Sequence, residues 1–464
     1  MAGTNVVQAI GPTYHLADVK AAVQSSINCF PRKISGDVWE MMSAEGSTDI
    51  VTLPAGVRGA RYVEPAGTNP ARWFVAAGNV LYAVNTDGTY VTVGNLAGGS
   101  TPVSMSNNLD SLVVVDGANL WVVALFDLVM TQVTVDGWRG SDNVDEMDGY
   151  FIFAEPGSDQ FYISGIDDPT RLDALDFSSA DALPDKIVAH TVNHHTVFFF
   201  GTKSTEIWVD SGGADFPFTR YNSYPIDIGI VGPYAFVNAA DTVYFVGKTD
   251  RGKAIVYELN GNRPVPISNS CIEGLLLGST DISLTELFTW QPKGSEFVCI
   301  NAPGINTTLV YDAKAKQWHE RGEWVDGEWT PLKWRFVTSI GTQFYGGDTD
   351  GKLFRVDETL NQISGRTMVR ERTWPHLISP ELEPVSYKGL EISCKTGYGG
   401  NITLQISNDG GNNFGPALLR SLGTIGRWMQ RVRWLNLGSA VNRVFRLRCS
   451  DNVPFVIYLA SVDA

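Results

Sequence analysis

The sequence has few charged residues for its size, and most of the charges are negative. Only 18% of the 464 residues are charged, and the formal net charge is −15. Tight binding of nucleic acid needs Lys and Arg to displace the counterions of the phosphates, so the total argues against that class of function. The low charged fraction also leaves much of the surface uncharged, which is typical of a chain covered by other subunits.

Cysteines and long apolar runs are scarce as well. The five cysteines lie far apart, and no two of them form a CxxC pair. We therefore expect reduced, buried thiols and no disulfide framework or zinc site. The N-terminus lacks a charged segment followed by an apolar run, and no apolar stretch is long enough to span a bilayer. We expect a protein that is made in a cytoplasm and is not anchored in a membrane.

The charge is unevenly distributed along the chain. From residue 368 to the end there are eleven Lys and Arg against seven Asp and Glu, a net of +4, so the preceding residues carry −19. Such an asymmetry predicts two domains with different neighbours.

A hairpin pattern repeats along the sequence. Each unit has a β-branched or aromatic run, a polar turn with Gly, Asp or Asn, and a second such run, which is typical of a tight β-hairpin. The units start at Arg72, Asp110, Asp148, Asn193, Asp241, Gly294 and Gly341, which is 38 to 53 residues apart. Four-stranded propeller blades repeat at roughly 40–50 residues. A closed ring covers the apolar face of every blade. We therefore predict an all-β fold with a β-propeller of six or seven blades; the alternative is two stacked β-sandwiches.

A domain boundary is predicted after the last hairpin, where residues 361–373 (NQISGRTMVRERT) are polar and charged. Beyond it, several stretches alternate apolar and polar residues as half-buried strands do, which predicts a C-terminal β-sandwich. We divide the chain into an N-terminal arm and docking segment at 1–60, the propeller at 61–362 and the sandwich at 363–464. Helices are few, and the longest is expected at residues 16–27.

Residues 193–213 (NHHTVFFFGTKSTEIWVDSGG) hold a pattern that resembles a set of metal ligands. His194, His195, Glu206 and Asp210 lie within one predicted hairpin. A metal needs three or four converging ligands, whereas adjacent residues of a strand point to opposite faces of the sheet. We therefore interpret the segment as a blade hairpin with a polar face and predict no metal site.

An acidic segment supplies the carboxylates that an enzyme of this fold would need. Paired carboxylates can act as general acid and base, and this segment contains Asp142, Asp145, Glu146 and Asp148. Nothing in the sequence places two of them across a cleft, so we favour a solvated loop. The motifs of nucleotide-binding loops and nucleophile elbows are also absent. We predict no catalytic residue and no cofactor.

Two features of the C-terminal part concern fold and partners. Residues 407–414 (SNDGGNNF) match the Asp-box pattern, in which Asp409 caps turn amides and Phe414 packs under the loop, so the match predicts a stabilised hairpin. Arginines also alternate with aromatic residues, a pattern that can bind nucleic acid. Because the rest of the chain is acidic, we favour a protein–protein surface for Arg427, Arg431, Arg433, Arg443, Arg446 and Arg448, interleaved with Trp428, Trp434 and Phe445.

Several segments, taken in order, resemble one family of phage proteins. The resemblance covers most of residues 24 to 360 and depends on the order and spacing of SSINCFPRKI, VTLPAGVRGARY, DGYFIFAEPGSDQFYISGIDDPTRLDALDFSSADALPDKI, HTVFFFGTKSTEIWVDSGG, TVYFVGKTDRGKAIVYELNGNRPVPIS, SCIEGLLL and TLVYDAKAKQWHER. The chain is similar to the packaged-DNA stabilisation proteins that form the tail hub, or nozzle, of short-tailed phages. The C-terminal part matches more loosely.

The resemblance implies a structural component of the virion tail with no catalysis and no cofactor. It implies a homo-hexameric ring below the portal adaptor, which closes the DNA channel after packaging and conducts DNA during ejection. The implied partners are the adaptor, a tail needle or plug, and tailspikes or fibres. The DNA passes without specific binding, which agrees with the acidic N-terminal part, because a negative wall repels phosphates over a Debye length of roughly 8 Å.

Two other functions compete with this one on the sequence alone. A propeller enzyme, a glycosidase or lyase acting on host surface glycans, would need inward-facing carboxylates about 5–9.5 Å apart. A carbohydrate-binding propeller would be a monomer with pockets lined by aromatic residues.

Overall fold

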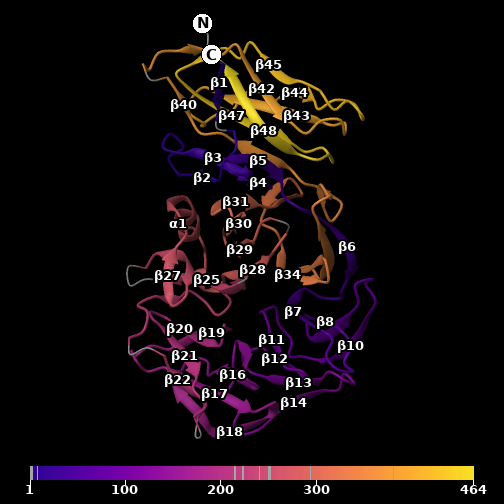
Figure 1. Cartoon of the computed structure of the whole chain (residues 1–464), viewed down its shortest axis with the longest axis vertical. Coiled ribbons are helices and arrows are strands. Elements are labelled where there is room, and N and C mark those ends of the chain that lie inside the picture. Colours follow the sequence, from indigo (N-terminus) through magenta and orange to yellow (C-terminus); the bar gives the residue numbers. More distant parts are fainter. Residues whose placement is uncertain are drawn as a thin grey trace.

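The computed structural model describes residues 4–7, 9–213, 216–221, 224–239, 241–248, 252–292, 294–379 and 381–464. Figure 1 shows two β-rich domains, a disc of blades below and a smaller domain above, with both chain ends on the upper domain. The prediction of an all-β chain is therefore confirmed.

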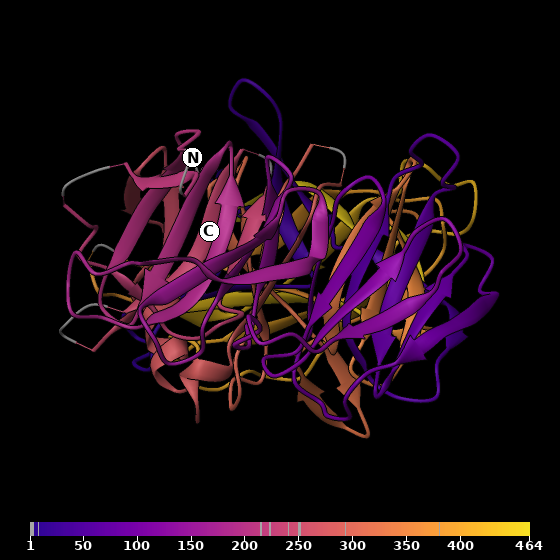
Figure 2. The ribbon, with the colours of Figure 1, turned by 90° about the horizontal axis from the view of Figure 1, so that it is seen from below.

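Seven sheets of at least four strands surround a common axis in the described part of the chain (Figures 1 and 2). The first four blades each take four consecutive strands: β7 (Val57–Val63), β8 (Arg72–Ala77), β9 (Val80–Val84) and β10 (Tyr90–Asn95); β11 (Ser104–Asn107), β12 (Ser111–Val115), β13 (Leu120–Ala124) and β14 (Met130–Val133); β15 (Val144–Met147), β16 (Tyr150–Ala154), β17 (Gln160–Gly165) and β18 (Asp168–Ser179); β19 (Ile187–Asn193), β20 (Thr196–Gly201), β21 (Thr205–Asp210) and β22 (Phe218–Arg220).

The remaining three blades complete the ring. Short segments accompany them: the helix α1 (Ser270–Leu277), the 3-10 turn Ile282–Leu284, and the strands β32 (Glu323–Val325) and β33 (Glu328–Thr330). The fifth blade has β23 (Gly229–Ile230), β24 (Phe236–Ala239), β25 (Thr242–Lys248), β26 (Ala254–Asn260) and β27 (Arg263–Pro266). The sixth has β28 (Glu286–Trp290), β29 (Phe297–Asn301), β30 (Thr308–Asp312) and β31 (Gln317–Arg321). The seventh has β34 (Trp334–Ile340), β35 (Gln343–Asp348) and β36 (Lys352–Asp357), together with β6 (Gly46–Thr52), β37 (Gln362–Ile363) and β38 (Arg366–Thr367).

The apolar cores lie between the blades. One cluster joins the first blade to the second through Phe74 and Leu112, and another joins the seventh blade back to the first through Leu353 and Trp73. Other clusters fill the remaining gaps around the ring. The middle strands of each blade are buried on both faces, so they read as continuous apolar runs in the sequence. The ring is closed because every blade covers the face of its neighbour.

An N-terminal strand closes the propeller. Strand β6 pairs antiparallel with β36, with Gly46 opposite Asp357 and Thr52 opposite Lys352, and so supplies the outer strand of the seventh blade. The predicted division at residue 61 differs from this arrangement, because β6 and most of β7 belong to the propeller. The residue pattern of a strand does not depend on whether its partner is near or about 300 residues away. The sequence therefore does not predict the pairing of β6 with β36.

The C-terminal domain is a β-sandwich, as predicted, and it also takes N-terminal strands. One sheet contains β4 (Cys29–Ser35), β5 (Val38–Ser43), β48 (Val456–Asp463), β42 (Gly389–Cys394) and β45 (Val432–Leu435), with β1 (Thr4–Val7) on β48. The other contains β3 (Val23–Ile27), β39 (Arg370–Thr373), β47 (Asn442–Cys449), β43 (Asn401–Ser407) and β44 (Leu418–Ser421), with β2 (Tyr14–His15), β40 (Leu377–Ile378) and the small pair β41 (Val385–Ser386) and β46 (Ser439–Ala440) nearby.

The helix expected at residues 16–27 is not formed. That segment contains the turn that follows β2, and strand β3. Strand β3 pairs with β39 and β31, so tertiary pairing overrides a weak local helical preference there. The described helix of eight residues is α1, whose start is capped by Asn269, which accepts from the backbone N–H of Cys271 and Ile272.

Candidate functional site

The junction between the two domains is built by the N-terminal segment. Strand β3 pairs in parallel with β31 of the sixth blade, where Ile27 lies opposite Glu320, and antiparallel with β39 of the sandwich, where Ser25 lies opposite Thr373. One sheet therefore runs from the sixth blade through β3 into the sandwich, as Figure 1 shows between the two domains. Backbone pairing on both edges of β3 thus links the two domains.

A buried arginine holds the N-terminal segment in this position. Arg372 on β39 is fully buried, and its guanidinium donates to the carbonyl oxygens of Ala9, Pro12 and Ser25, to Ser26 Oγ and to Gln24 Oε1. Burial lowers the pKa of Arg372 to about 10, so the group stays charged at neutral pH. The polar segment 361–373, predicted as a domain boundary, thus ends in a strand whose charges are buried.

A second buried arginine connects the N-terminal segment to the sixth and seventh blades. Arg321 Nη1 lies 3.0 Å from Glu45 Oε2, and Nη2 donates to the Glu45 carbonyl oxygen at 2.6 Å. The guanidinium lies 5.2 Å from the Trp290 ring and 5.1 Å from the Trp334 ring. Burial raises the pKa of Glu45, and the Arg321 charge opposes that shift.

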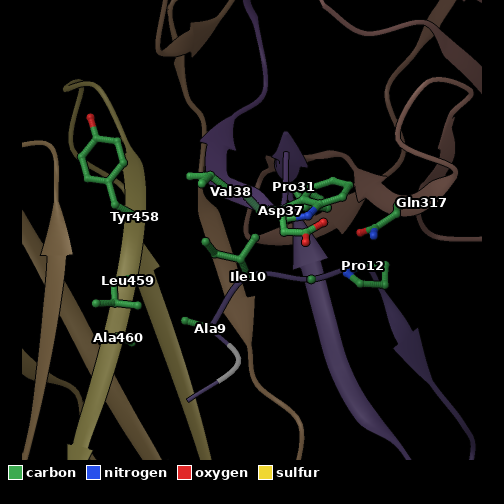
Figure 3. Close-up of a pocket in the computed structure, with 12 residues that line it drawn as sticks. Ala9, Ile10, Pro12, Pro31, Asp37, Val38, Gln317, Tyr458, Leu459 and Ala460 are labelled. Carbon is green, nitrogen blue, oxygen red and sulfur yellow. The ribbon is translucent and has the colours of Figure 1, made fainter. Parts of the chain in front are cut away.

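A cavity of about 520 Å³ opens beside this junction. Its walls come from residues 9–12, from the β4–β5 hairpin and from β48, and Gln317 of the sixth blade completes it (Figure 3). Strand β48 pairs with β5 up to Ile457 and with β1 from Ala460 onward, so the cavity lies where neither strand pairs with Tyr458 and Leu459. Figure 3 shows mostly apolar side chains around it, with Asp37 among them.

The double histidine does not form a metal site with its neighbours. His194 and His195 lie in the turn between β19 and β20, with φ of 47° and 54°, so they are turn residues and not the strand residues we expected. They contact different blades: His195 Nδ1 lies 3.3 Å from Asp148 Oδ1, and His194 Nε2 lies 3.8 Å from Asp241 Oδ1.

The two carboxylates of the same hairpin have structural contacts. Glu206 is buried and accepts from the Ala182 N–H, from Trp208 Nε1 and from Arg220 Nε. Asp210 accepts from the Gly212 N–H. Over the described residues, no group of three or more His, Cys, Asp or Glu side chains is placed to hold a metal ion.

The acidic segment is a strand and not the solvated loop we favoured. Asp145 and Glu146 lie on β15, the innermost strand of the third blade, while Asp142 precedes it and Asp148 follows in the next turn. Asp145 Oδ2 accepts from the Val192 N–H at 3.2 Å. Burial raises the pKa of Asp145 to about 7, and the nearby Arg61 charge opposes that rise. The sequence missed this strand because charged residues conceal its short apolar pattern.

The Asp-box prediction is confirmed for Asp409. Its carboxylate accepts from the Asn413 N–H at 2.9 Å and from Ser407 Oγ at 2.7 Å, and these bonds lower its pKa to about 2. Phe414 contacts the Arg446 guanidinium at 3.8 Å from the ring centre. The motif therefore fixes a turn between β43 and β44.

The C-terminal arginines do not form one common surface. Arg443 is fully buried, donates to the Leu437 carbonyl oxygen and lies 4.3 Å from the Tyr387 ring centre. Glu371 pairs with Arg446 and Arg448, and Glu391 pairs with Arg431 and Arg433. Trp434 and Phe445 are buried, whereas Trp428 is 61% exposed. Arg443 therefore does not reach the surface, and the protein–protein surface stays a prediction for the other arginines.

These features define a class of protein. They are those of a two-domain β protein, a seven-bladed propeller and a sandwich tied together by N-terminal strands. No helix in the described ranges is long and apolar enough to cross a membrane.

The family is shown by two family models that together cover most of the chain. The model described as "Bacteriophage P22 Gp10, beta-propeller" matches residues 29–360, and the model described as "Bacteriophage P22 Gp10, beta-sandwich" matches residues 372–464. The chain therefore belongs to the family of the bacteriophage P22 tail protein Gp10, the tail hub or nozzle of short-tailed phages, and is a structural protein of a phage tail. The resemblance noted in the sequence is confirmed.

Comparison with solved structures gives weaker likenesses. It is similar to virginiamycin B lyase from Staphylococcus aureus, with 10% identity and a TM-score of 0.45, over 67% of this chain and 98% of that chain. It is also similar to the WD40 β-propeller domain of Doa1, with 11% identity and a TM-score of 0.39, over 67% and 96% of the two chains. No curated protein matches the sequence.

Proposed function

We propose that copies of this chain form a homo-hexameric ring that closes the DNA channel of the tail after packaging, stabilises the packaged DNA and conducts it during ejection. The observation that carries the proposal is membership of the tail-hub family over both domains. In this proposal the ring lies below a portal adaptor and contacts a tail needle or plug, and tailspikes or fibres attach around it.

Two physical features support a conduit for DNA. The first 367 residues carry a net charge of −19, and a negative wall weakens contacts with phosphates that would otherwise slow the DNA. The sheet that continues through β3 and the buried arginines at the junction tie the two domains together, which suits a part that resists internal pressure.

Mass measurement of the assembled particle tests the ring. Native mass spectrometry of the full-length chain, alone and with the adaptor of the same phage, is expected to show six copies per ring in at least one of the two samples. A chain that stays monomeric in both samples would contradict the proposal, and hydrolysis of lipopolysaccharide by that monomer would point to an enzyme.

The role in DNA retention needs a separate measurement. Virions that lack the protein are expected to release their DNA after packaging, as judged by nuclease-sensitive DNA in the lysate. The purified ring is also expected not to retard double-stranded DNA in a gel at physiological salt. Stable DNA retention in virions without the protein would contradict the proposed closure of the DNA channel, but it would not contradict the proposed hexameric ring.

A further inference from the structure

The loop between β44 and β45 exposes three large apolar side chains. Ile425 is 86% exposed, Trp428 61% and Met429 92%. With Arg427 they form what we call the knob. Scattered apolar residues are normal on a protein surface, but three within five residues form an exposed apolar cluster, and such clusters mark sites where another molecule binds.

The knob is held in one conformation by the neighbouring loop. The Gly426 N–H donates to the Gly397 carbonyl oxygen at 3.0 Å, and Thr396 Oγ1 donates to the Trp428 carbonyl oxygen at 2.8 Å. The Trp428 ring contacts Tyr398 edge to face, with ring centres 5.3 Å apart. A Cβ at Gly397 would lie 2.5 Å from the indole, so glycine is needed for this close approach. A loop that is already ordered loses little entropy on binding.

The junction cavity has the complementary chemistry. Polar and apolar groups share its lining; the apolar ones include Val38 and Leu459, which are 56% and 47% exposed, and the Tyr458 ring beside them is 43% exposed. The volume of about 520 Å³ falls in the range of roughly 300–1,000 Å³ that suits bound groups. Asp37 lies at its edge (Figure 3). Within the described residues neither the Asp37 carboxylate nor the Arg427 guanidinium has an ion-pair or hydrogen-bond partner.

The knob does not occupy the cavity of its own chain. Trp428 and Met429 line a separate hollow of about 320 Å³ over β42, and Leu459 lines both that hollow and the cavity. The hollow beside the knob and the junction cavity therefore share one lining residue, Leu459.

We infer that the knob of one copy inserts into the junction cavity of a second copy of this chain. This inference rests on the proposed ring. The apolar side chains of the knob pack on Val38, Tyr458 and Leu459, and the free Arg427 of one copy pairs with the free Asp37 of the next. The contact joins two different patches, the knob of one copy and the cavity of the next. Repeated contacts of this heterologous kind form a ring when the rotation between neighbouring copies closes. Buried aromatic anchors dominate the energy of protein interfaces, so Trp428 is expected to contribute most.

Sedimentation velocity and native mass spectrometry of the full-length chain, alone and with the adaptor, test the contact. The Trp428→Ala variant is expected to weaken self-association at least about tenfold. Phe126→Ala is the matched control, because Phe126 is a 71% exposed aromatic residue on the second blade, and it is expected to change nothing.

Charge reversal and cross-linking make the test specific. Asp37→Arg and Arg427→Asp are each expected to weaken association, and the double variant is expected to restore it. A Val38→Cys, Met429→Cys chain is expected to form a disulfide between copies on mild oxidation. A dimer that is lost when either the knob or the cavity is changed would support the contact between copies and contradict the proposed hexameric ring.

Three results would overturn the inference. A ring that forms normally with Trp428→Ala and Asp37→Arg would overturn the contact and leave the proposed function standing. A chain that stays monomeric under all conditions would overturn both. A monomer that binds phosphatidylglycerol vesicles through Trp428 would show that the knob is a lipid contact.

Discussion

Removing Arg321 is expected to destabilise the propeller strongly. The side chain is fully buried, whereas the Glu45 side chain that it pairs with is 7% exposed, so Arg321→Ala leaves a carboxylate buried without its charge partner. Loss of one partner of a buried pair costs about 3–5 kcal/mol. Replacing both residues, as in Arg321→Met with Glu45→Met, removes both charges and is expected to cost much less than the single change.

Urea unfolding followed by tryptophan fluorescence measures this difference, because Trp290 and Trp334 flank the guanidinium. Arg355→Ala is the matched control, since Arg355 is 41% exposed, lies 3.8 Å from Asp357 on the seventh blade and is expected to cost at most about 1 kcal/mol. The reasoning is refuted if Arg321→Ala is as mild as Arg355→Ala, or if the double variant is no better than Arg321→Ala.

Three further predictions concern single groups. Burial lowers the pKa of His190 from 6.5 to about 4, so the propeller is expected to lose up to about 3 kcal/mol as the pH falls from 6.5 to 4; His190→Gln should flatten that part of a urea-unfolding series against pH. Hydrogen bonds lower the pKa of Asp409 from 3.8 to about 2, so its contribution is present above pH 4 and lost as the pH falls toward 2; Asp409→Asn should lower the sandwich melting temperature at pH 7 and remove that acid-dependent loss in calorimetry. Replacing His194 and His195 by Asn and Gly suits their positive φ and should stabilise the turn by up to about 1 kcal/mol in thermal unfolding, and loss of ring assembly would show that the histidines have a role there.

The sequence predicted the blades well because their signal is local. Each hairpin contains both of its strands and its turn within about twenty residues, so the alternation and the turn residues near Arg72 or Asp241 were sufficient. The argument against a metal site at His194 and His195 assumed that both lie on a strand, whereas they lie in a turn. The interpretation of them as structural residues of a blade agrees with their contacts.

The sequence failed where a segment depends on distant partners. Residues 16–27 had helical spacing, yet β3 forms because two strands, more than 290 and 340 residues away, offer it backbone pairing on both edges. The charged segment 361–373 was interpreted only as a domain boundary, yet Arg370 and Arg372 are buried because carbonyl groups from distant segments surround them.

The sequence by itself determined the all-β class, the repeating blade, the separate C-terminal sandwich and the charge asymmetry, since all of these follow from composition and short-range pattern. Only the tertiary structure decided that β6 closes the ring, that β3 joins the two domains, and that an exposed knob and an unfilled cavity lie on the same sandwich. The pairings of β6 and β3 depend on contacts between residues hundreds of positions apart, and the exposure of the knob and the shape of the cavity depend on how the folded segments pack.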